Sequence, residues 1–232
     1  MKSSLISHPL DAALLHRHAP RSLHPPTLVS RTLGVALLLA VFLGGCSIVP
    51  QSRLDPTRTY ILGVPAAPGA TPGPDARAGA QVGIRALTLA GYLQGTKTML
   101  VRHGENELVP QLYARWAEPL DSGLARILRD TLLASGAAAG VDARAGGMSR
   151  DADCELSIWI LACEGTQNPD GTHGVRFAAD YEIRFRASPE NTVRRAFAAP
   201  SAAWDGKDFS QLAALLSASA EKLATNIASA LK

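Results

Sequence analysis

The stretch GVRFAADYEIRFR, residues 174–186, alternates large apolar and charged side chains along most of its length. Because successive side chains of a strand point to opposite faces, this period of two predicts a strand with one buried and one solvated face. The residues expected on the buried face are Val175, Phe177, Tyr181, Ile183 and Phe185. Those expected in solvent are Arg176, Asp180, Glu182, Arg184 and Arg186.

The predicted partner of this strand is the segment CELSIWILAC, residues 154–163. Apolar residues occupy both of its faces, with Leu156 and Ile160 on one side and Trp159 and Leu161 on the other. This pattern predicts a central strand that is covered on both faces. Asn-Pro-Asp-Gly at 168–171 is strong turn chemistry between the two segments, so they are expected to form an antiparallel hairpin.

Weaker strand patterns and two amphipathic helices complete the expected fold. Strands are predicted at residues 82–89, 98–102 and 192–198, with an edge strand at 59–64. One helix is expected to start at Pro119, in a first-turn position, and to carry a leucine stripe as far as Leu132. A second is expected to start at the N-cap Asp208 and to reach the C-terminus. The predicted class is α+β, a mixed or antiparallel sheet with both helices packed on one face.

Residues 33–43, LGVALLLAVFL, form an apolar run near the N-terminus. Eleven residues reach roughly 16 Å as a helix, about half of a hydrocarbon core of roughly 30 Å. Arg31 precedes the run and Gly44 and Gly45 follow it, which is the layout of an export signal. The alternative is a buried apolar helix followed by an ordinary cysteine.

Leu-Gly-Gly-Cys at 43–46 resembles the lipobox of bacterial lipoproteins. The resemblance implies that residues 1–45 are a signal peptide and that Cys46 carries acyl chains such as palmitate, a covalent lipid with no further cofactor. By the same resemblance, Ser47 implies sorting to the outer membrane with the protein facing the periplasm. We expect a tether at 46–58 and a single domain at 59–232, with a loop rich in Pro and Gly at 65–80.

Charge gives no support for a nucleic-acid partner. The chain has 23 basic and 20 acidic residues, but the first 46 residues contain four of the basic residues and one of the acidic ones. The remainder is neutral overall, whereas nucleic-acid binding needs a clustered basic surface.

Motifs of catalysis and metal binding are missing from the sequence after residue 46. Only His103 and His173 remain there, and neither has ligand spacing. No G-x-S-x-G elbow occurs. Cys154 and Cys163 would lie roughly 30 Å apart along one strand, beyond disulfide reach. We therefore expect neither an enzyme nor a metal site.

The segment LYARWAEPL, residues 112–120, is a hinge from extended chain into helix, for which helix docking is a sufficient explanation. It also resembles the Y-x-x-W-A-E-P-L signature of the PqiC/YmbA-like family of ABC-type transport auxiliary lipoproteins. Gly-Tyr-Leu at 91–93 agrees in order with the same family. The signature positions are Tyr92, Leu93, Tyr113, Trp116, Ala117, Glu118, Pro119 and Leu120.

This resemblance implies an outer-membrane adaptor that accompanies an MCE-domain periplasmic protein in intermembrane phospholipid transport and supports envelope integrity. A homo-oligomer would suit a ring-shaped partner of this kind. Two alternatives stay open. One is a stand-alone periplasmic lipid carrier with its own apolar pocket, and the other is a periplasmic hydrolase, for which the sequence offers no catalytic constellation.

Overall fold

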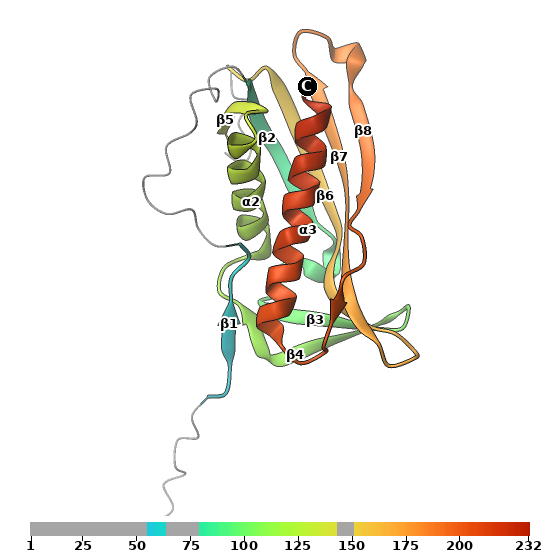
Figure 1. Cartoon of the computed structure of the whole chain (residues 1–232). Helices are drawn as coiled ribbons and strands as arrows, with labels where there is room; N and C mark the ends of the chain where they lie inside the picture. Colours follow the sequence, from blue (N-terminus) through green and yellow to red (C-terminus); the bar gives the residue numbers. More distant parts are fainter. Residues whose placement is uncertain (1–54, 64–78, 143–150) are drawn as a thin grey trace, which may run out of the picture. The chain divides into compact units, whose positions relative to one another are not determined.

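The computed structural model describes residues 55–63, 79–142 and 151–232, which belong to one compact unit that begins at Asp55 (Figure 1). Cys46, Ser47 and most of the predicted loop at 65–80 lie outside the described residues. The elements in chain order are β1 (Arg58–Tyr60), β2 (Ala80–Leu89), η3 (Gly91–Leu93), β3 (Thr98–His103), β4 (Glu107–Trp116), α2 (Leu120–Ala134), β5 (Ala138–Asp142), β6 (Cys154–Gln167), β7 (His173–Phe185), η4 (Pro189–Asn191), β8 (Val193–Ala198), β9 (Ala203–Trp204) and α3 (Phe209–Ala230).

The predicted hairpin is confirmed by β6 and β7. The two strands pair antiparallel from Cys154 opposite Phe185 to Gln167 opposite His173. In the turn, the Gly171 N–H donates to the Asn168 carbonyl at 2.9 Å. Gly171 has a φ of 84°, a left-handed conformation that glycine adopts without steric cost.

The opposite edge of β6 is shared by two strands that follow one another. β2 runs parallel to β6 over Cys154–Ile160, and β3 runs parallel to it over Gly165–Gln167. Within the described residues, no strand pairs with residues 161–164 on this edge. A bulge at Leu161 in the pairing of β6 with β7 lies at the same level. Bulges bend a strand, so the sheet changes direction here.

The α+β class is confirmed, and the sheet is mixed. Parallel pairs join β1 to β4 and β2 to β5, while β3 pairs antiparallel with β4 and β7 with β8. Both helices lie side by side on one face of the sheet (Figure 1). Asp208 caps α3 by accepting the Ser210 N–H at 2.8 Å, as predicted. Pro119 is the N-cap of α2 rather than its first residue.

The prediction that β6 is covered on both faces is wrong. Trp159 is 40% exposed and Leu161 is 47% exposed, on the face opposite the helices. Trp159 lies directly across from Asp180 of β7, so a large apolar side chain sits among charged neighbours. Although β6 has apolar residues on both faces, only the face toward the helices is covered. Separately, no helix among the described residues is long and apolar enough to cross a membrane.

Cys154 and Cys163 are free and buried, in agreement with the expectation that they do not form a disulfide. Desolvation, with a smaller contribution from Asp153, raises the pKa of Cys154 to about 11. Desolvation raises the pKa of Cys163 further, and the charge of Glu164 adds to this effect. Since the thiolate is the reactive form, both thiols are poor nucleophiles in the folded chain.

Native protein incubated with iodoacetamide at pH 8 is therefore expected to remain unmodified at both cysteines. The thiolate fraction of Cys154 at this pH is about one part in a thousand, and burial restricts access further. Mass spectrometry of intact protein before and after denaturation measures the difference. Two further adducts are expected only after denaturation, and rapid native labelling would contradict the buried positions in β6.

Candidate functional site

The two signature segments meet at a groove of about 500 Å³. The groove is lined by the end of β2, by the segment from Leu93 to Lys97 and by the start of α2 at Pro119 and Leu120. A backbone hydrogen bond of 2.6 Å from the Trp116 N–H to the Lys97 carbonyl holds the segments together. Family positions that are separated in the chain are thus neighbours in the fold.

The eight signature residues divide by burial. Leu93, Trp116 and Leu120 are buried in the hydrophobic core, and Tyr92 and Glu118 are half-buried. The exposed positions are Tyr113, Ala117 and Pro119. The signature therefore combines residues that pack the domain with residues that are available to another molecule.

Glu118 fastens the chain that follows β1 onto α2. It forms an ion pair with Arg126, whose Nη2 also donates to the Leu62 carbonyl at 2.7 Å. Gly123 permits this approach, because a Cβ there would lie 3.0 Å from Glu118 Oε1 and 3.3 Å from Leu62 Cβ. The Gly63 N–H donates to Ser217 Oγ at 2.7 Å, so α3 holds the same segment from its other side.

Replacing Arg126 with alanine is expected to lower the free energy of unfolding by about 1–2 kcal/mol. The variant leaves the Leu62 carbonyl and the Glu118 carboxylate without their shared donor, and hydrogen bonds to charged groups contribute about 1.5–3 kcal/mol net. Because the Arg126 and Glu118 side chains are partly exposed, the loss is expected at the lower end of this range. Equilibrium denaturation measures the loss. Arg129→Ala is the matched control, because Arg129 is exposed on the same helix and its ion pair is with the half-exposed neighbour Asp130. It should cost about 0.5 kcal/mol or less, and equal losses would contradict the role of Arg126.

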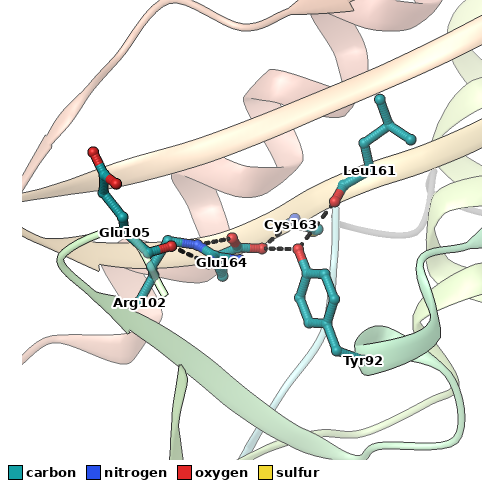
Figure 2. Close-up of polar contacts among 6 residues, drawn as sticks. All are labelled: Tyr92, Arg102, Glu105, Leu161, Cys163 and Glu164. Atoms are coloured by element: carbon teal, nitrogen blue, oxygen red, sulfur yellow. Dashed lines mark hydrogen bonds and ion pairs between the residues drawn. The ribbon is translucent and has the colours of Figure 1, made fainter. Parts of the chain in front are cut away.

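A buried carboxylate, Glu164, occupies the gap between β2 and β3 (Figure 2). Its Oε2 accepts the Tyr92 hydroxyl at 2.7 Å and the Cys163 N–H at 2.9 Å. Its Oε1 accepts Arg102 Nε at 2.8 Å. The Tyr92 hydroxyl also lies 3.0 Å from the Leu161 carbonyl oxygen. Side chains thus satisfy backbone groups of β6 where no neighbouring strand does so.

The network extends over the outer side of the gap. Arg102 Nη1 donates to the Glu105 carbonyl at 2.9 Å, and its guanidinium lies 5.7 Å from the centre of the Tyr92 ring. The Tyr92 ring and the Glu164 carboxylate thus both stabilise the positive charge of Arg102 at this partly buried position. The bend in the sheet is therefore braced from η3, β3 and β6 together.

Both donors of the network keep their protons near neutral pH. Desolvation, followed by the hydrogen bond and charge of Glu164, raises the pKa of Tyr92 far above the ordinary value. Partial burial disfavours the charged form of Arg102, but the hydrogen bond and charge of Glu164 outweigh it and raise the pKa. A tyrosine and an arginine that do not exchange protons serve to position the chain, whereas a general acid or base has a pKa near the working pH.

Of this network, the sequence resemblance predicted only Tyr92. Glu164 and Arg102 were missed, although a single acidic residue after the apolar run WILAC was an available signal. His103 and His173 are half-exposed and lie at strand ends, with the His173 ring 5.8 Å from that of Trp204. No group of three or more potential metal ligands occurs among the described side chains.

Residues 60–228 match the family described as the ABC-type transport auxiliary lipoprotein component. Among solved structures, an uncharacterised protein has 15% identity and a TM-score of 0.54, with 76% of this chain and 99% of that one covered. A Xanthomonas campestris protein of the DUF330 family has 16% identity and a TM-score of 0.55, with 74% and 92% covered.

A PelC dodecamer from Paraburkholderia phytofirmans has 17% identity, a TM-score of 0.33 and coverage of 64% and 86%. This likeness is too low to support an argument about assembly. No curated protein matches the sequence. The family match covers most of the chain, including both signature segments, and the chain therefore belongs to the family of ABC-type transport auxiliary lipoprotein components.

Proposed function

We propose that this protein is a non-enzymatic, lipid-anchored adaptor of an MCE-type, ABC-linked system that moves phospholipid between membranes. Membership of the auxiliary lipoprotein family is the observation that carries the proposal. The anchor is the acylated Cys46, which Ser47 directs to the outer membrane so that the domain faces the periplasm. Loss of the protein then weakens the envelope because lipid delivery is interrupted.

The alternative, a stand-alone lipid carrier, needs an apolar cavity of its own. The space between the helices and the sheet is instead filled by side chains that are fully buried, namely Leu124, Leu128, Leu132, Leu156, Ile158, Ile160, Leu212, Leu223 and Ile227. The groove of about 500 Å³ at the signature is open and partly polar. Pockets for drug-sized ligands already occupy about 300–1,000 Å³. A phospholipid with two acyl chains is larger, which favours the adaptor.

Gentle detergent extraction of cross-linked cells tests the adaptor proposal. Recovery of an MCE-domain protein with the wild-type chain is expected, and native mass spectrometry of the purified chain alone should show no retained phospholipid. Absence of the MCE-domain protein, with the lipid on Cys46 confirmed by mass, would overturn the proposal. Phospholipid retained by the isolated chain would favour the carrier.

The Cys46→Ser variant, exported behind a signal peptide whose cleavage does not require Cys46, tests the anchor separately. Two or more acyl chains give stable membrane attachment, so their loss should move the protein from the membrane fraction to the soluble periplasmic fraction. The domain itself should remain folded, because its compact unit begins at Asp55. Fractionation and circular dichroism measure the two properties. Full envelope function of the released variant would contradict a role for the anchor.

A further inference from the structure

β4 carries an exposed apolar bulge that the packing of the domain does not use. In the pairing of β3 with β4, Thr98 lies opposite Arg115 and Leu100 lies opposite Pro110, so residues 111–114 face the single residue Met99. Leu112 and Tyr113, within this bulge, are 70% and 59% exposed, the highest values among the exposed large apolar residues of the described chain. Bulges turn side chains away from the regular faces of a sheet.

The bulge lies beside the place where the N-terminal segment joins the domain. β1 runs parallel to β4, and its first residue, Arg58, is the partner of Ala114, which directly follows Tyr113. Asp55 is nine residues after Cys46. Because an extended chain spans at most about 3.3–3.6 Å per residue, Asp55 lies within roughly 30 Å of the lipidated residue. This end of the domain is therefore held near the membrane that contains the acyl chains.

The chemistry of the bulge fits a lipid surface. Tyrosine is enriched at membrane interfaces, where its ring lies among lipid and its hydroxyl among headgroups. Exposed Arg58 and Arg115 flank the bulge in the pairing of β1 with β4, and basic side chains next to a membrane attract anionic headgroups. By contrast, the other exposed apolar pair, Trp159 and Leu161, lies on β6, where Asp180 is the cross-strand neighbour of Trp159.

We propose that Leu112 and Tyr113 insert into the surface of the membrane that holds the acylated Cys46, and so fix the orientation of the domain at that membrane. The inference rests on the proposed lipid anchor. A tether alone would leave the domain free to rotate, whereas a second contact beside the tether restricts which face is presented to a partner. The groove that Leu93 and Pro119 line would then be held in one orientation relative to the membrane.

Spin labelling of the complete lipidated protein tests this contact. A nitroxide is placed at Tyr113→Cys, with Asn191→Cys as the matched control in exposed η4. η4 follows β7 at the end where Phe185 pairs with Cys154. At the other end of β6, β3 pairs with β6, and β4 pairs with β3. Cys154 and Cys163 are buried, so the introduced thiol takes the label. Both proteins are reconstituted in vesicles of phosphatidylethanolamine and phosphatidylglycerol after mass spectrometry of Cys46.

The expected result is a several-fold higher ratio of collision with oxygen to collision with a polar nickel chelate at position 113 than at position 191. Equal ratios on a lipidated protein would overturn the membrane contact while leaving the adaptor proposal intact. Exclusion of both agents from position 113 would show that protein covers the bulge, a second copy or a partner, and would also overturn it. A chain without lipid on Cys46 would overturn the anchor and this inference together.

Discussion

Replacing Glu164 with alanine is expected to lower the free energy of unfolding by about 3–5 kcal/mol, the range for breaking a buried ion pair by removal of one partner. The Glu164 side chain is fully buried and that of Arg102 is only 13% exposed. Without the carboxylate, Arg102, the Tyr92 hydroxyl and the Cys163 N–H lose an acceptor together. Equilibrium denaturation with urea measures the change.

Glu182→Ala is the matched control for this prediction. Glu182 lies on the neighbouring strand β7 and, like Glu164, pairs with arginine: it accepts from Arg184 at 3.0 Å and from Arg194 at 2.7 Å. Those arginines are 45% and 75% exposed, so water replaces the lost acceptor and the expected cost is about 1 kcal/mol or less. Equal, small losses in both variants would show that the sheet does not depend on Glu164 at its bend.

The hairpin of β6 and β7 could be predicted because its information is local. The alternation of residues 174–186 and the turn chemistry at 168–171 specify strand, face and register within one continuous segment. The ten-residue strand β4 was missed because Pro110 lies within it and proline weakens a strand pattern. The strands β5 and β9 were missed because they are short, and β5 consists mainly of small residues without alternation. Their pairing depends on β2 and β7, which lie far away in the sequence.

The exposed face of β6 could not be read from its residues for a related reason. Trp159 and Leu161 have the hydrophobicity of core residues, but both helices pack on the other face of the sheet. Periodicity states which residues share a face, and it does not state which faces find a covering element. The role of Glu164 could not be predicted for the same reason. It depends on the gap that β2 and β3 leave beside β6, and the local sequence does not specify that gap.

The signature at 112–120 could reflect helix docking or a surface for a partner, and the structure assigns each of its residues to the core or to the surface. Trp116 and Leu120 are core residues, which agrees with helix docking. Pro119 lines the open groove with Leu93, and Tyr113 is exposed on the bulge. A family signature in this chain thus describes a packed corner and the surface that it presents, and substitutions at buried and exposed positions should have different effects.

Trp116→Ala is expected to lower the free energy of unfolding by about 3–5 kcal/mol, the range for truncating a buried large aromatic side chain. Trp116 is 5% exposed, pairs with Tyr60 of β1 and directly precedes the turn into α2. A cavity there loosens both the N-terminal strand and the start of the helix. Tyr113→Ala, three residues earlier and exposed, should change stability by about 0.5 kcal/mol or less. Urea denaturation of both variants measures the contrast, and near-wild-type stability of Trp116→Ala would mean that this tryptophan acts at a partner surface rather than in the core.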